Sequence, residues 1–224
     1  MAHTARSVSF SGNAARVPTD AFDFEGFRGW CASDDFPESA RPTFAEGEVF
    51  LDMSPESIET HNSVKTALII DLGTLVRVED LGRVYSDGAL FTHEGAKLST
   101  EPDGMFASWE TLESGRLRSS PRKDGDPDGI ELLGAPDVVI EVVSRSSVRK
   151  DNVVLRAAYA RAGIPEYWLV DARGEAIAFQ ILRLESGTYV GAPSLSQSSR
   201  VFEREFRLER ERNRVGEWSY RLRC

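Results

Sequence analysis

The chain has 224 residues, of which 41% are hydrophobic and 28% are charged, so it is long enough to bury one well-packed core. Its formal net charge of −9 argues against nonspecific binding of nucleic acid over the whole surface. No apolar run approaches the roughly 18 residues of a membrane span, and the N-terminus lacks the apolar segment of a signal peptide. The two cysteines, Cys31 and Cys224, do not indicate a disulfide framework, so we expect a cytoplasmic protein without a membrane partner.

The first part of the chain is predicted to hold two helices with a strand or hairpin between them. Residues 1–17 show no clear pattern and are expected to form a flexible tail. A short helix is predicted around Phe24 and Trp30, and a strand or hairpin near Gly47. In residues 58–75 apolar side chains recur every three or four positions, which predicts an amphipathic helix.

The second part is predicted to alternate strands with one more helix. Residues 111–134 contain several prolines and glycines and are expected to form a polar loop, as a lid or insertion. Residues 138–143 are predicted to be a strand buried on both faces, followed by a helix that ends at Gly163. Further strands are expected beside Asp87-Gly88, after Pro102-Asp103, on both sides of Arg173-Gly174 and in a closing hairpin around residues 206–222. This order predicts an α/β fold with a mixed central sheet flanked by helices, in a single domain of residues 18–224.

An acid in the middle of the apolar strand VVIEVV is the most informative feature. Burying a carboxylate is costly unless the group is paired or binds a metal, so Glu141 needs a partner. Asp137 shares its strand face but lies about 13 Å away, so the partner has to come from a neighbouring strand, and Asp103 is the natural candidate. Two such carboxylates can hold Mg²⁺ or Mn²⁺, an ion that activates water and neutralises charge on a phosphodiester. Alternatively, Glu141 pairs with an arginine, and Asp103 and Asp137 are turn residues after prolines.

The stretch that follows this strand is basic. It holds Arg145, Arg149, Lys150, Arg156 and Arg161 against the single acid Asp151. In an acidic chain, this stretch is either a basic rim around one site or ordinary solvated surface. The sequence leaves both interpretations open.

Three segments around these acids together resemble a known family. They are EGEVFLDMSPESIETHNSV, STEPDGMF and GAPDVVIEVVSRSSVRKDNVVLRAAYARAGIPEYWLVD. Their order and spacing are similar to the Uma-type family of candidate restriction endonucleases, within the PD-(D/E)XK nuclease superfamily. The resemblance extends over about residues 20–190. It implies a restriction-endonuclease-like core with catalytic acids on two adjacent strands.

The resemblance also implies roles for individual residues. Asp103 matches the aspartate of the Pro-Asp element, and Glu141 matches the second acid, so both are expected to bind Mg²⁺ or Mn²⁺. Glu48 is a loose match for a further N-terminal acid. His61 matches a histidine of the family's first helix, although a packing role on an apolar helix face is equally open.

The catalytic lysine is where this chain departs from the pattern. The superfamily's simplest form places it two residues after the acid, where Val143 stands, and the family commonly places it four residues after Asp151, where Leu155 stands. Leucine cannot orient water or stabilise phosphoryl charge. Lys150 is our candidate for the missing cation, with Arg156 as the other possibility, and either requires a rotated or rearranged helix.

The resemblance thus implies a metal-dependent endonuclease that hydrolyses phosphodiester bonds of DNA as a homodimer, impaired by the loss of the helix lysine. The intact acid pair favours this hypothesis. The missing lysine favours an alternative, a catalytically inactive nuclease-fold protein that binds nucleic acid or protein. A third possibility is a small acidic partner protein in which Glu141 only forms an ion pair. Catalytic activity and any preference for DNA sequence or methylation are not determined by these residues.

Overall fold

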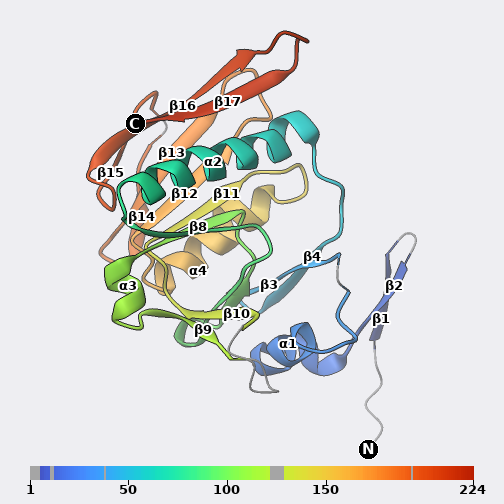
Figure 1. Cartoon of the computed structure of the whole chain (residues 1–224). Coiled ribbons are helices and arrows are strands. Elements are labelled where there is room, and N and C mark those ends of the chain that lie inside the picture. Colours follow the sequence, from blue (N-terminus) through green and yellow to red (C-terminus); the bar gives the residue numbers. More distant parts are fainter. Residues whose placement is uncertain (1–5, 11–12, 38, 122–128, 193) are drawn as a thin grey trace, which may run out of the picture.

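The computed structural model describes residues 6–10, 13–37, 39–121, 129–192 and 194–224, with side chains described from residue 17 onward. These residues form two six-stranded sheets, a three-stranded sheet and an N-terminal hairpin, with helices packed between and around them (Figure 1). The α/β class and the mixed sheet are confirmed. The second large sheet is an addition to the single central sheet that the sequence predicted.

The first sheet carries the acid-bearing strand at its centre. Its order is β14-β13-β12-β11-β8-β5, with β5 Gly82–Ser86, β8 Gly104–Ser108, β11 Val138–Val142, β12 Glu166–Asp171, β13 Ala178–Glu185 and β14 Thr188–Val190. β11 runs parallel to β12 and antiparallel to β8, so the sheet is mixed. A helical crossover joins the parallel pair, as parallel strands require.

The second sheet contains most of the segment that we expected to be a loop. Its order is β4-β3-β7-β6-β10-β9, with β3 Arg41–Ala45, β4 Glu48–Asp52, β6 Leu90–His93, β7 Leu98–Thr100, β9 Leu117–Ser120 and β10 Glu131–Gly134. The prediction of a loop over residues 111–134 is therefore wrong for both β9 and β10, which pair antiparallel, and for helix α3 (Trp109–Glu113). Backbone pairing at a sheet edge needs few apolar side chains, and in β9 only Leu117 is buried, so the sequence signal was weak. Residues 122–128 of this segment lie outside the described part of the chain.

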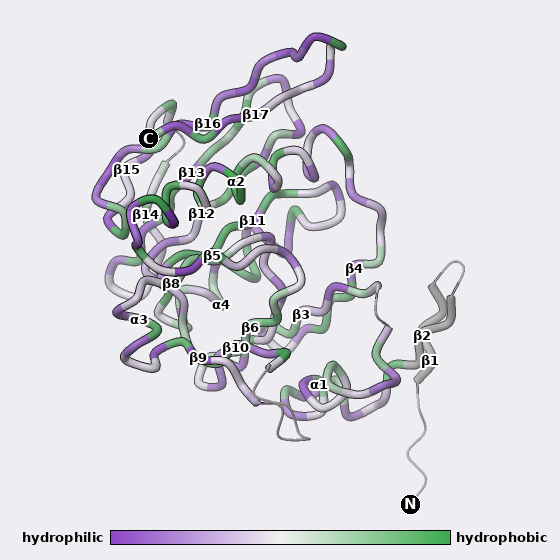
Figure 2. The backbone as a smooth tube through the Cα atoms, in the orientation of Figure 1, coloured by the Kyte–Doolittle hydropathy of each residue, from purple (hydrophilic) through white to green (hydrophobic). Residues whose placement is uncertain are grey.

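Helices cover both faces of the first sheet. On one face lies α2 (Ser63–Val78), entered through a π-helical turn, η2 (Ile58–Asn62). Val64, Leu68 and Leu72 of α2 pack on the strand residues Val138 and Ile140. On the other face lie the π-helical segment η4 (Lys150–Leu155) and α4 (Arg156–Arg161), which pack between the two large sheets. Figure 2 shows apolar residues concentrated on α2 and β11.

Strand alternation decides which way Glu141 points. Val138, Ile140 and Val142 face α2, whereas Val139 and Val143 face the core that contains η4 and α4. Glu141 lies between these last two positions on the same side of the strand. The buried acid therefore points toward the helix that follows β11.

The two ends of the chain add smaller elements. The closing hairpin is confirmed: β16 (Arg204–Arg212) pairs with β17 (Trp218–Arg223), and β15 (Gln197–Ser199) joins β16. Near the N-terminus, η1 (Thr19–Phe22) leads into α1 (Phe24–Cys31), and a further short turn, η3 (Glu94–Ala96), connects β6 to β7. Within the expected tail of residues 1–17, β1 (Arg6–Phe10) and β2 (Asn13–Val17) form an antiparallel hairpin, which the sequence did not predict.

Of the residues described, no helix combines the length and apolarity needed to cross a membrane.

The two cysteines differ in environment, and this difference predicts their reactivity. Cys31 is half-buried at the end of α1, whereas Cys224 is exposed. Burial, with the negative charges of Glu101 and Glu131 adding to it, raises the pKa of the Cys31 thiol to about 12. At pH 8 only about one such thiol in 10,000 is ionised, and the thiolate is the reactive form.

We therefore expect iodoacetamide at pH 8 to alkylate Cys224 in the native protein and to leave Cys31 unmodified. In urea both thiols should react. Mass spectrometry of the two peptides measures the outcome. Equal labelling rates in the native protein would contradict the burial of Cys31.

Candidate metal centre

A cavity of about 40 Å³ lies where the two large sheets meet η2 and η4. All three residues that the sequence singled out, Asp103, Glu141 and Lys150, line this cavity, together with His61 and Asp151. A single water needs roughly 10–15 Å³, so the space suits an ion with a few waters. The structure thus brings together side chains from four separate elements.

Asp103 lies at the entrance to β8 and is held against β11. Its Oδ2 atom accepts a hydrogen bond from the backbone N–H of Val142 at 2.7 Å. The antiparallel register, which places Gly104 opposite Ile140, brings the preceding residue beside the C-terminal half of β11. Lys65 Nζ lies 3.5 Å from Oδ1. Asp103 is therefore positioned by backbone pairing and lies next to Glu141, as the spacing of the two strands predicted.

Glu141 is almost completely buried, with 2% of the residue exposed. Its Oε1 atom accepts a hydrogen bond of 2.6 Å from the hydroxyl of Tyr159, and its Oε2 atom lies 4.0 Å from Lys150 Nζ. Burial raises the pKa of Glu141 well above its usual value; Lys150 opposes this shift, while Asp151 and Asp103 add to it. The alternative of an arginine partner is wrong, since among the described residues the partners of this carboxylate are a tyrosine and a lysine.

Lys150 reaches the cavity because its helix begins with a π-helical segment. Such a helix closes i→i+5 hydrogen bonds, so residue 150 lies one turn before residue 155. Lys150 Nζ lies 3.1 Å from Asp151 Oδ1 and 4.0 Å from Glu141 Oε2. Leu155 is fully buried in the apolar core, and Arg156 donates to the backbone oxygen of Tyr189. The rearrangement required for Lys150 is thus present, whereas Arg156 is directed elsewhere.

Asp151 completes a group of three buried acids around this lysine. Only 1% of the residue is exposed, and one carboxylate oxygen accepts a hydrogen bond from the Ser147 hydroxyl. Burial raises the pKa of Asp103 and Asp151 as it does that of Glu141; the charges of His61 and Lys65 are the main opposition for Asp103, and the charge of Lys150 for the other two. Two ammonium groups face these three carboxylates, Lys150 beside Asp151 and Glu141 and Lys65 beside Asp103, so the negative charge is only partly compensated. This donor set of hard oxygens fits a divalent cation such as Mg²⁺ or Mn²⁺.

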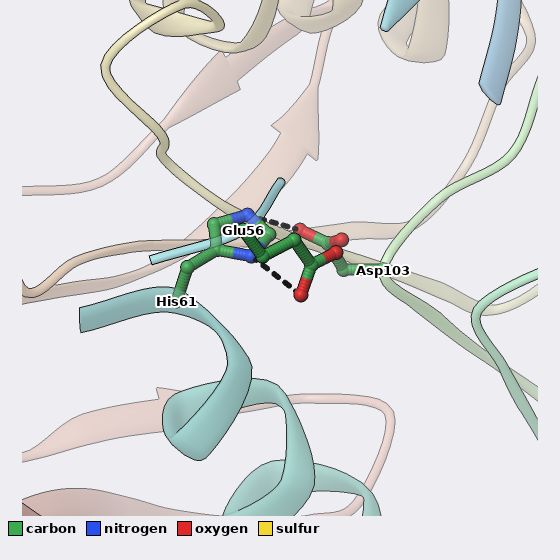
Figure 3. Close-up of side chains that lie close together, drawn as sticks. All are labelled: Glu56, His61 and Asp103. Carbon is green, nitrogen blue, oxygen red and sulfur yellow. Dashed lines mark ion pairs between the residues drawn. The ribbon is translucent and has the colours of Figure 1, made fainter. Parts of the chain in front are cut away.

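A second group of possible ligands shares Asp103 (Figure 3). His61 lies between two carboxylates, with Nδ1 3.3 Å from Glu56 Oε2 and Nε2 3.6 Å from Asp103 Oδ2. One ligand atom from each of Glu56, His61 and Asp103 lies within 4.8 Å of the others, so these residues can hold a metal ion. Within the described structure, the buried Nδ1 atom of His61 has no hydrogen-bond partner.

Sequence reasoning missed Glu56. Burial would raise the pKa of this carboxyl, but hydrogen bonding and the charge of Lys65 outweigh burial and hold the pKa at about 2. Glu56 also pairs with Arg41 from β3. Its position two residues before the first helical residue is typical of an acid that stabilises a helix N-terminus, so its spacing gave no sign of a site.

Glu48 and Asp137 lie away from the cavity; this was expected for Asp137 and not for Glu48. Glu48, the loosely matched N-terminal acid, forms an exposed ion pair with Arg149 and is not among the residues that line the cavity. Asp137 accepts hydrogen bonds from the backbone of Ser108 and the hydroxyl of Thr111, a structural role at a turn. Glu101 lines the cavity although the sequence gave no reason to single it out, and burial raises its pKa to about 7.

Comparison with known proteins identifies the family and the fold. The family described as "Uma2: Putative restriction endonuclease" matches residues 24–211. Among solved structures, the chain is similar to a putative nuclease belonging to DUF820 from Anabaena variabilis ATCC 29413, with a TM-score of 0.53 and 18% sequence identity over 77% of this chain and 85% of that chain. At this identity the structural likeness shows the fold alone. No curated protein matches the chain.

The family match spans both six-stranded sheets, helices α1 to α4 and every acid described above, whereas β1, β2 and β17 lie outside it. The chain therefore belongs to the Uma2 family of putative restriction endonucleases.

Proposed function

We propose that this protein is a metal-dependent endonuclease that hydrolyses phosphodiester bonds in DNA. One observation carries the proposal: Asp103, Glu141 and Lys150 line one cavity, with Lys150 between Glu141 and Asp151. An acid pair from adjacent strands with an ammonium beside it is the set that hydrolysis of a phosphodiester needs. Membership of the Uma2 family supports the same chemistry.

Asp103 and Glu141 are the proposed ligands of Mg²⁺ or Mn²⁺. A bound ion of this kind would lower the pKa of a coordinated water and neutralise charge on the phosphate. Asp103 is held by the N–H of Val142 and Glu141 by the hydroxyl of Tyr159, so each carboxylate is oriented before an ion arrives. Asp103 also belongs to the group with Glu56 and His61, and it is the one residue common to both sets.

Lys150 is proposed to supply the positive charge that Leu155 cannot. Its ammonium can donate hydrogen bonds to the attacking water or to a phosphate oxygen, because only one carboxylate oxygen, Asp151 Oδ1, lies within 3.1 Å of it. Asp151 keeps the ammonium charged and directs it into the cavity. In this arrangement the lysine is displaced along the helix rather than lost, so the impairment inferred from the sequence is smaller than the substitution at position 155 suggests.

One site cuts one strand, and cutting both strands of a duplex takes two sites. We therefore propose a homodimer, as the resemblance implied. A plasmid assay distinguishes the two cases, because nicked circles come from single cuts and linear plasmid from paired cuts.

The first prediction concerns cleavage. With Mg²⁺ or Mn²⁺, the wild type should nick supercoiled plasmid, and Glu141→Gln should lose at least about 100-fold in rate, since even the loss of a residue that supports a metal ligand costs 10- to 100-fold. Glu48→Gln is the matched control, because it removes an exposed carboxylate outside the cavity. If neither the wild type nor the variant cuts, even with Mn²⁺ at high protein concentration, the catalytically inactive alternative is favoured.

The second prediction locates the ion. By calorimetry, Asp103→Asn should weaken Mn²⁺ binding whichever of the two ligand groups holds the ion, because Asp103 belongs to both. Glu141→Gln should weaken Mn²⁺ binding by at least about tenfold. His61→Gln should have a smaller effect. The opposite result is that His61→Gln binds Mn²⁺ weakly while Glu141→Gln binds it as the wild type does. This result would place the ion among Glu56, His61 and Asp103 and reject our assignment of Glu141.

The third prediction concerns the lysine. Lys150→Met should slow cleavage by about 100- to 1,000-fold, the typical cost of losing one donor to a developing negative charge. Mn²⁺ affinity should not fall, because removing a cation makes the cavity more negative. Arg149→Met, next in sequence but exposed and paired with Glu48, is the control.

Folding has to be checked in the same experiment. Removing Lys150 leaves buried carboxylates unpaired, which costs about 3–5 kcal/mol, so melting is measured with Mn²⁺ present. An unchanged cleavage rate in folded Lys150→Met would show that the lysine only neutralises the acids.

A further inference from the structure

A polar groove of about 240 Å³ adjoins the metal cavity. Four residues line both spaces: Arg41, Asp52, His61 and Ser144. A chain molecule that places one of its groups in the cavity therefore extends into this groove. The groove is not needed for the chemistry described above, and it explains residues that the proposed mechanism does not use.

The polar groups that line the groove are mainly hydroxyls and guanidinium groups. The residues it does not share with the cavity include Ser54, Ser57, Thr60, Arg145, Ser146 and Arg173. Of the described residues that line it, none is phenylalanine, tyrosine or tryptophan, and the ring of His61 lies between two carboxylates, so the groove offers little surface on which a base could stack. Hydroxyls and arginines are the side chains that contact phosphate and sugar in nucleic-acid complexes.

The three arginines of the groove differ in their partners. Arg41 pairs with Glu56, and Arg173 binds both carboxylate oxygens of Asp171 at 2.7 and 2.9 Å. Arg145 is exposed and makes no hydrogen bond or ion pair with any residue that the structure describes. Its charge is therefore available to a ligand, whereas the charges of the other two are compensated within the protein.

The backbone around Arg145 is held rigidly. Ser144 and Ser147 form reciprocal bonds, in which the Ser144 backbone N–H donates to the Ser147 hydroxyl at 2.9 Å and the Ser147 N–H donates to the Ser144 hydroxyl at 3.1 Å. This turn precedes the helix that carries Lys150, and Ser57 on the opposite wall precedes η2. Both helix N-termini favour an anion in the groove.

The acids of the groove do not cancel this preference. Glu56 is bound by Lys65 and Arg41, and the Asp52 carboxylate accepts from the backbone N–H of Ser54. His61 also lines the groove; its side chain is only 9% exposed, and its Nδ1 atom lies 3.3 Å from Glu56 Oε2. Of the described cations that line the groove, Arg145 is therefore the one without a carboxylate partner in the protein.

We propose that this groove binds a backbone phosphate of the nucleic-acid strand next to the phosphodiester held in the cavity, and that Arg145 is its principal contact. The inference rests on the proposed endonuclease function for the identity of the ligand. Because a phosphate is the same at every base step, the contact adds affinity and register without sequence preference.

The test measures binding without turnover. Anisotropy of a labelled 20-base-pair duplex and of a single strand is followed in Ca²⁺ over a salt series. Arg145→Ala should weaken binding about tenfold and reduce the slope of log K against log salt by about 1. Arg145→Lys, which keeps the charge, should retain the slope. Arg118→Ala is the charge-matched control, because Arg118 is exposed on β9 and is not a groove residue.

Each outcome decides the proposal. Equal effects of Arg145→Ala and Arg118→Ala, or an unchanged salt slope, would overturn it even if the protein cuts plasmid. A selective Arg145 effect in a protein that does not cut would support the phosphate contact while the endonuclease proposal fails. An Arg145 effect seen with inorganic phosphate alone, and not with either oligonucleotide, would overturn the assignment to a nucleic-acid backbone.

Discussion

Burial of negative charge is the constraint on which the rest of this structure depends. Glu141, Asp151 and Asp103 are withdrawn from water among apolar strands, and each would be costly without compensation. Tyr159, the Val142 N–H and Lys150 meet part of that cost through direct contacts. The remaining negative charge is the basis of our proposal that the cavity holds a divalent cation, because a protein optimised only for stability would have little reason to keep three acids there.

The same constraint accounts for features that lie outside the cavity. The two large sheets meet where Arg41 of β3 and Lys65 of α2 both bind Glu56, so opposite charges join elements from different layers. The π-helical start of the helix after β11 places Lys150 against the acids while Leu155 packs in the core. A regular α-helix could not place Lys150 in the cavity and Leu155 in the core in the same way, because its hydrogen bonds join residues four apart rather than five apart. Local irregularity in this helix therefore follows from an electrostatic requirement.

Membership of the Uma2 family is shown by the family match, and this chain departs from the pattern that the resemblance implies in the placement of its cations. Leu155 stands where the resemblance implies a lysine, and Lys150, one helical turn earlier, lines the cavity. Arg145 precedes the same helix and lines the adjoining groove. Under the two proposals above, a strand of nucleic acid would meet both charges at the N-terminal end of this helix.

By itself the sequence determined the α/β class, the helices over residues 58–75 and 148–162 and the buried strand of Glu141, and it named Asp103 as the acid on the neighbouring strand. These follow from periodicity and from the cost of a lone buried carboxylate, which are local properties. Only the tertiary structure showed that a second sheet forms, that Glu56 lies beside His61, that Glu48 lies outside the cavity and that Lys150 lines it. Edge pairing in β9 and β10 uses backbone groups that every residue carries, and the meeting of Glu56 with Asp103 joins residues 47 positions apart through packing. Such contacts depend on the relative placement of whole elements, which no local pattern of residues specifies.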